Sequence, residues 1–178
     1  MNRRRVIAAV LTLAGVSGGV RPARAQGTLA SIAVDAVVIN QTMTITTLRD
    51  LAFGTVIKGV ATTILPTAGN SGEWEVAGSP NAFATITLAL PTVLNNIQAL
   101  PGSTMPVSFS ATDALWRRST NNPAGATVFD PSVGVTNARF GPPPTPFLYI
   151  WLGGTVNPAP TAKPGIYTGV VIVTVFYT

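Results

Sequence analysis

The chain has 178 residues with eleven basic and six acidic side chains, and it contains neither cysteine nor histidine. Their absence excludes disulfides, thiol chemistry, Ser-His-Asp triads and histidine-based zinc sites. The length is enough for one domain with a proper core and hardly enough for two.

The first 25 residues have the pattern of a secretory signal peptide. A triplet of arginines at 3–5 precedes an apolar run of 11 residues, and a small-x-small cleavage site, ARA at 23–25, follows. The run is shorter than the roughly 20 residues that a transmembrane helix needs. We therefore expect export, with cleavage after Ala25.

The expected signal peptide carries most of the excess basic charge. It holds five of the eleven basic residues and no acidic one, so six bases and six acids remain after cleavage. With equal numbers of basic and acidic residues, the sequence no longer favours a basic surface that binds nucleic acid or an anionic membrane. We expect no nucleic-acid partner, no cofactor and no metal.

An extended pattern begins next to the expected cleavage site, in TLASIAVDAVVIN at 28–40. Its even positions form an unbroken apolar row: Ala30, Ile32, Val34, Ala36 and Val38. A second apolar strand follows around Met43 and Ile45 and leads into LAFG at 51–54. The first strand has no obvious place in its own sheet, so we assign 26–38 to an N-terminal extension and 39–178 to the domain.

Strand periodicity dominates the middle of the chain, and no helical pattern is evident. Apolar residues alternate in AFATITLAL at 82–90, in MPVSFS at 105–110 and in FLYIWLGG at 147–154, the last of which is apolar on both faces. Gly, Pro, Asn and Ser clusters separate these runs. The spacing predicts an antiparallel two-sheet sandwich of seven or eight strands, with a long excursion at about 113–146.

The excursion contains a candidate surface loop with Asp113, Trp116, Arg117 and Arg118. The Trp would stack on a pyranose ring and the Arg side chains would reach hydroxyls of a sugar or a partner protein. The simpler interpretation, which we favour, is a solvated loop with one anchoring Trp.

Two further motifs have a chemical and a plain interpretation. Glu73 and Glu75 flank Trp74 at strand spacing, which places both carboxylates on one face, as in glycosidases. We favour an exposed, solvated strand, because no third catalytic group is identifiable. Gly153-Gly154 is more typical of a turn or bulge than of a ligand site.

The chain ends in the uncharged run GIYTGVVIVTVFYT at 165–178. Its apolar positions alternate between two faces. One face has Tyr167, Val171, Val173, Val175 and Tyr177, and the other has Ile166, Val170, Ile172 and Phe176. Such a run is aggregation-prone, so something must cover it soon after synthesis.

The two ends of the chain resemble those of the structural subunits of chaperone-usher pili. Tyr177 is the next-to-last residue, Gly165 is fourteenth from the end, and an apolar strand precedes the domain. LAFG at 51–54, GGT at 153–155 and the C-terminal run also look like a cysteine-free family of bacterial surface proteins, carried as a domain of unknown function. The disulfide that often joins the first two pilin strands is missing here.

The resemblance implies a non-enzymatic subunit with an incomplete immunoglobulin-like β-sandwich, exported through the periplasm to a pilus on the cell surface. A donor strand from a neighbour, here Ala30 to Val38, would complete each sandwich and give a head-to-tail polymer. The groove and chaperone-binding strand would comprise Gly165, Tyr167, Val171, Val173, Val175 and Tyr177. Further partners would be a periplasmic chaperone, an outer-membrane usher and surface glycans, in cell adhesion and biofilms.

An alternative from another functional class remains open. The chain would then be a secreted or periplasmic carbohydrate-binding module that completes its own sandwich and stays monomeric. The deciding question at this stage is whether the N-terminal apolar row pairs within its own domain or leaves it.

Overall fold

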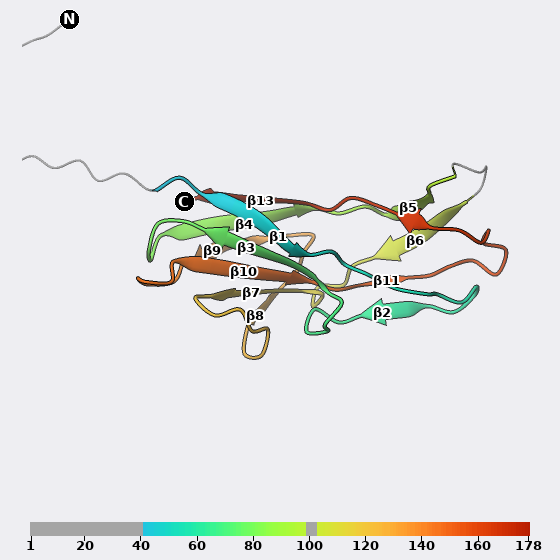
Figure 1. The fold of residues 1–178 in the computed structure, drawn as a ribbon, viewed down its shortest axis with the longest axis horizontal. Helices are drawn as coiled ribbons and strands as arrows, with labels where there is room; N and C mark the ends of the chain where they lie inside the picture. Colours follow the sequence, from blue (N-terminus) through green and yellow to red (C-terminus); the bar gives the residue numbers. More distant parts are fainter. Residues whose placement is uncertain (1–40, 99–102) are drawn as a thin grey trace, which may run out of the picture. The chain divides into compact units, whose positions relative to one another are not determined.

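The computed structural model describes residues 41–98 and 103–178, which belong to one compact unit, Val38–Thr178. These residues form antiparallel strands and no helix, which confirms the prediction of an all-β fold with the character of a β-sandwich (Figure 1). In the part of the chain that the structure describes, no helix is long and apolar enough to cross a membrane.

The thirteen strands form three sheets. In spatial order, the first sheet has β1 (Thr44–Arg49), β3 (Gly72–Ala77), β10 (Phe147–Leu152), β7 (Ala114–Arg118) and β8 (Thr127–Phe129). The second has β12 (Tyr167–Thr168), β5 (Val93–Asn96), β6 (Thr104–Ser108), β11 (Gly154–Val156) and β2 (Thr62–Ile64). The third has β13 (Ile172–Tyr177), β4 (Phe83–Ala89) and β9 (Val135–Arg139).

The main core combines residues of the first and third sheets. Strand alternation directs Leu148, Ile150 and Leu152 of β10 and Ala84 and Ile86 of β4 into it, as the sequence predicts. The other fully or almost fully buried members are Val76, Ala114, Phe129, Ala138 and Phe140.

Strand β10 is also covered on its opposite face. Tyr149 and Trp151 pack there with Leu115 of β7, and Trp151 is only 1% exposed. This confirms the prediction that FLYIWLGG is apolar on both sides because it is a central strand, with β3 on one side and β7 on the other.

A second, smaller core lies at the end of the domain formed by the second sheet (Figure 1). Met105 and Val107 of β6 pack with Val156 of β11. The chain passes from β10 into β11 at Gly153 and Gly154, so this pair joins two sheets rather than forming the predicted turn or bulge. A Cβ atom on Gly154 would lie 2.9 Å from the Phe109 ring, and one on Gly153 would collide with the Ile64 carbonyl.

Two predictions about strands are wrong. Residues 41–98 and 103–178 alone form thirteen strands where seven or eight are expected, because several long runs are interrupted and continue in another sheet. The expected excursion at 113–146 instead contains β7, β8 and β9. Their polar residues hide the alternation, which becomes evident only when β7 pairs with β10 and β8, and β9 pairs with β4.

The centre of the main core provides a stability test. Replacing Ile150, which is fully buried in β10, with Ala should lower the free energy of unfolding by about 2–5 kcal/mol, since it leaves a cavity between packed sheets. Urea denaturation measures this difference. Val133, which is 77% exposed, is the control, and its change to Ala should stay within about 0.5 kcal/mol. Equal losses at the two positions would contradict the assigned core.

Candidate functional site

The C-terminal run forms two strands rather than the single one expected. In β12, Tyr167 pairs with Asn96 of β5. After a break at residues 169–171, β13 pairs along its whole length with β4, from Ile172 opposite Ala89 to Tyr177 opposite Ala84. The run therefore lies along both the second and the third sheet.

The two faces of the run differ in burial as the alternation predicts. Val171, Val173, Val175 and Tyr177 are partly buried against the main core, and Tyr167 packs on the second core. The opposite face is exposed to between 50% and 74% at Ile166, Val170, Ile172 and Phe176. The inward face thus contributes to the core without being fully covered.

Strands β1 and β13 are both edge strands. Each pairs with one neighbour only in the described part of the chain, β1 with β3 and β13 with β4. Figure 1 shows the cyan β1 and the red β13 along the same border of the domain. On the free side of each strand, alternate backbone N–H and C=O groups have no ladder partner.

An apolar groove opens between the segments attached to these two edges. It has a volume of about 970 Å³, and its walls are mainly residues 50–58, which follow β1, and residues 162–171, which precede β13. The floor consists of core side chains from both ends of the domain: Trp74, Leu94, Met105, Val107, Phe109 and Val156. We call this feature the groove.

The next-to-last tyrosine joins the two edge strands beyond one end of the groove. The Tyr177 hydroxyl donates to the Gln41 carbonyl at 2.8 Å and accepts from the Ser79 N–H at 2.7 Å. Its ring lies 5.8 Å from that of Phe140. A Cβ atom on Gly78 would lie 2.8 Å from the hydroxyl, so a glycine there leaves room for this contact.

The other end of the groove is formed around Gly165. This residue has φ of 150°, and a Cβ atom on it would collide with the Asn96 side chain, so both the backbone and the close approach require glycine. The Tyr167 hydroxyl donates to the Lys163 carbonyl at 2.7 Å. The Gly59 N–H donates to the Pro158 carbonyl at 2.8 Å. This hydrogen bond links the chain just after the first wall, residues 50–58, to the chain just before the second wall, residues 162–171.

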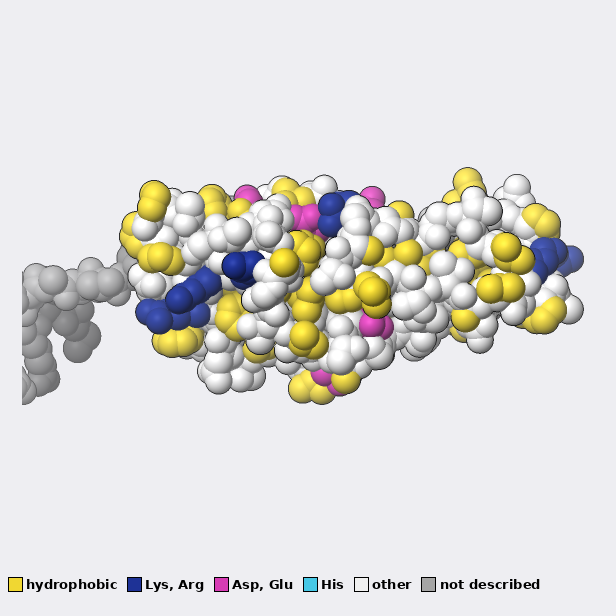
Figure 2. All heavy atoms as spheres, turned by 90° about the horizontal axis from the view of Figure 1, so that it is seen from below, with side chains coloured by type: hydrophobic (Ala, Val, Ile, Leu, Met, Phe, Trp, Pro, Cys, Tyr) yellow, Lys and Arg dark blue, Asp and Glu magenta, His cyan; other side chains and the backbone are white. Residues whose placement is uncertain are grey.

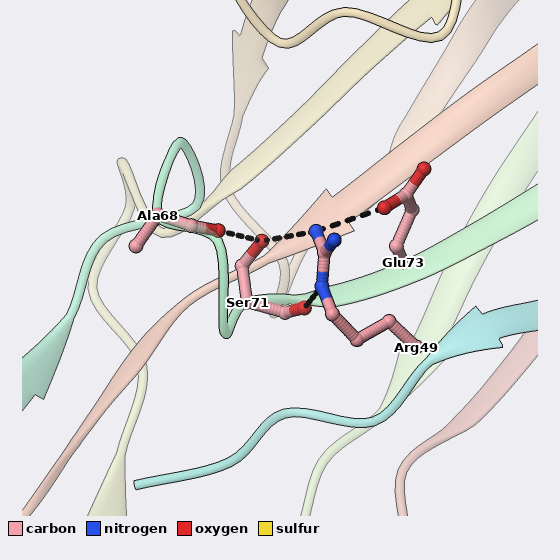
Figure 3. Close-up of polar contacts among 4 residues, drawn as sticks. All are labelled: Arg49, Ala68, Ser71 and Glu73. Carbon is pink, nitrogen blue, oxygen red and sulfur yellow. Dashed lines mark hydrogen bonds and ion pairs between the residues drawn. The ribbon is translucent and has the colours of Figure 1, made fainter.

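A polar network fixes the place where β1 ends and the first wall begins (Figure 3). The Arg49 guanidinium pairs with the Glu73 carboxylate at 2.8 Å and donates to the Ser71 carbonyl at 2.8 Å. The Ser71 hydroxyl in turn donates to the Ala68 carbonyl at 2.8 Å. The network holds the end of β1 against the start of β3, directly beside the groove wall.

The expectation that Glu73 and Glu75 are solvated on an exposed strand is wrong for Glu73, which is 5% exposed. The two carboxylates share one face of β3, as predicted, but each already has a partner. Glu73 pairs with Arg49, and Glu75 accepts a hydrogen bond of 2.8 Å from the Tyr149 hydroxyl. The cause is tertiary, because aromatic residues of β10 cover this face.

The expected surface loop around Trp116 is a strand. Trp116, Arg117 and Arg118 belong to β7, and Asp113 is buried just before it. Trp116 packs against the main core, and its Nε1 is buried without a hydrogen-bond partner in the described residues. Arg117 donates to the carbonyls of Asn122 and Ala124.

The three β7 residues do line a shallow hollow of about 440 Å³ with Ser119 and Thr120. The alternation of β7 places Trp116 and Arg118 on one face and Arg117 on the other, so the three expected residues are divided between two faces. Figure 2 shows one face of the domain, on which Lys and Arg side chains lie in separate small groups among hydrophobic and polar ones.

Part of the groove is not evident from the sequence. Only LAFG at 51–54 points to the first wall, and nothing in the sequence places Trp74 on the floor. The expected donor residues, Ala30 to Val38, lie outside the described residues. Among the residues that are described, no cluster of three or more Asp or Glu side chains forms a metal site.

Comparisons of the chain with protein-family models, curated proteins and solved structures find no significant match. The function is therefore inferred from the groove, the residues that line it and the two nearby edge strands.

Replacement of Tyr177 by Phe tests the link between the edge strands. It should lower the free energy of unfolding by about 1–3 kcal/mol, because two hydrogen bonds are lost while the ring contact with Phe140 stays. Tyr167→Phe is a size-matched control that loses a single exposed hydrogen bond, and should cost less. Denaturant titration of both variants measures the difference. A loss for Tyr177→Phe no greater than for the control would contradict the assigned role.

Tyr149, on the covered face of β10, should make the free energy of unfolding fall at alkaline pH. Burial, and next the hydrogen bond to Glu75, raise the pKa of Tyr149 from 10.0 to about 12. As the pH rises above 10, Tyr149 therefore loses its hydroxyl proton in the unfolded chain before it does so in the folded one. The free energy of unfolding accordingly declines as the pH rises towards about 12. Unfolding free energies measured from about pH 8 to about pH 12 should fall less steeply for Tyr149→Phe than for the original chain. Identical slopes would contradict this assignment.

Proposed function

We propose that the chain is a non-enzymatic structural subunit of a bacterial surface fibre of the pilus type. Each subunit accepts, in its groove, the N-terminal apolar strand of the next subunit. The observation that carries the proposal is the apolar groove between the segment that follows β1 and the segment that precedes β13, with core residues as its floor.

The partial burial of the core along one border supports strand acceptance. Met43, just before β1, and Val171, Val173 and Val175, at β13, pack against the main core but remain partly exposed. An extended segment between the edges would cover such side chains and pair with free backbone groups of the edge strands. One added strand thus satisfies apolar and polar groups together.

The apolar row at the N-terminus has the chemistry that such a segment needs. Its five members recur at every second position, so an extended strand presents all of them to one side. Ile32, Val34 and Val38 would each contribute about 1.5–3 kcal/mol on full burial, before the cost of ordering. This is large beside a domain stability of about 5–15 kcal/mol, so the joint would dissociate slowly.

A head-to-tail contact of this kind produces a filament, because each subunit offers its groove to one neighbour and its strand to another. The exposed edges and the apolar groove also need cover before assembly. We therefore include a periplasmic chaperone and an outer-membrane usher as partners, with export directed by residues 1–25. Adhesion to surface glycans and a role in biofilms would be properties of the assembled fibre.

The alternative, a monomeric carbohydrate-binding module, has less support. Trp116 packs against the main core, and Arg117 lies on the opposite face of β7. An enzymatic role for Glu73 and Glu75 has little support either, because both carboxylates have partners within the first sheet.

Deleting residues 29–38, or replacing Val34 with Arg, should abolish or strongly reduce polymerisation, since the groove would receive no apolar strand. The variants are expressed with the chaperone, and size-exclusion chromatography with electron microscopy measures polymer. Val133→Arg, at an exposed turn position, is the control and should polymerise normally.

Filaments formed by the truncated chain would exclude donation from this segment. A monodisperse monomer of the unaltered chain that binds a glycan, and loses that binding on Trp116→Ala, would instead establish the alternative.

A further inference from the structure

We propose that Lys58 and Lys163 form a cationic clamp at one end of the groove, which pairs with Asp35 of the incoming strand from a second copy of the chain. The inference rests on the proposed function and adds to it a charge-based selection of the strand and its register.

The two lysines are distinctive in both sequence and position. They are the only lysines of the chain. Both line the groove, Lys58 from the first wall and Lys163 from the second, and both are exposed. Within the described residues, neither forms an ion pair, whereas Arg49 pairs with Glu73. The groove therefore has two unneutralised cations on opposite walls.

The balance of charge along the groove favours an acidic segment. Asp50 is the one acidic residue among the described residues that line it, against the two lysines. Asp35 is the sole acidic residue before Asp50 in the sequence, and it lies within the apolar row. The incoming strand is therefore complementary in charge to the groove.

Strand alternation would place Asp35 on the correct side. With Val34 and Ala36 directed at the groove floor, the side chain between them points away from the floor, towards the rim. Lysine side chains are long and flexible, so exposed lysines on the two walls can reach a carboxylate at the rim. The clamp thus requires no burial of charge.

The length of the strand allows its two possible directions to be compared. The apolar row Ala30–Val38 spans nine residues, and the second wall spans residues 162–171. If Val38 lies beside Lys163, Asp35 lies three residues away, or about 10 Å along the strand. In the reverse direction, with Ala30 beside Lys163, the offset is five residues, or about 17 Å. The clamp therefore favours the antiparallel arrangement.

The clamp can be tested by exchanging the charges of Asp35 and the two lysines and measuring how fast residues 26–178 polymerise. Asp35→Lys alone, and Lys58→Asp with Lys163→Asp, should each slow polymerisation at low salt by about two- to fivefold or more. All three substitutions together should restore most of the rate, because the charges are complementary again. Light scattering follows the rate, and thermal melting verifies that each variant is folded.

Salt dependence provides a second test that uses a milder variant. Polymerisation of the original chain should slow as salt rises from about 0.02 M to about 0.5 M, whereas Asp35→Asn should be slower at low salt and nearly insensitive to it. Arg118→Asp, an exposed strand residue that does not line the groove, is the control and should retain the original rate and salt dependence.

The outcomes separate the clamp from the proposed function. If Asp35→Asn keeps the original rate and salt dependence, or the triple exchange restores nothing, while Val34→Arg still blocks assembly, the clamp is wrong and strand donation stands. If Val34→Arg polymerises normally, strand donation from this row fails, and the clamp fails with it.

Discussion

The domain depends on an apolar core whose border is formed by two edge strands. β1 and β13 come from different sheets, and each pairs on one side only among the described residues. Core side chains between the segment that follows β1 and the segment that precedes β13 form the floor of an open groove instead of a closed interior. Burial of this surface in trans is favourable for the same reason that the core forms, and backbone groups of the edges supply direction and register.

The two ends of the C-terminal run make different contacts. Tyr177 connects β13 to the chain before β1 and to the turn after β3 through two hydrogen bonds. Gly165 allows the chain to pass tightly against Asn96 at the other end, where the lysines lie. Arg49 and Glu73 hold the wall that follows β1. A rigid frame of this kind would reduce the ordering cost of an incoming strand.

The chain has few charged side chains, and those of the first sheet and of the groove have different surroundings. Glu73 and Glu75 are engaged with Arg49 and Tyr149 on the covered face of the first sheet. The two lysines remain at the groove, where a mainly apolar surface gives affinity without selecting a register. A complementary charge on the incoming strand would supply that selection at little cost, because the pair stays at the rim.

Alternation of period two by itself determined the all-β class and the faces of most strands, including Ile86, Ile150 and Val175, because side chains of a strand point alternately to opposite sides. It did not determine strand partners. Burial of Glu73 depends on β10, which is distant in sequence, and the inward position of Trp116 depends on β7 pairing with β10. The groove likewise depends on the tertiary structure, because its walls, residues 50–58 and 162–171, are far apart in the sequence and only folding brings them together.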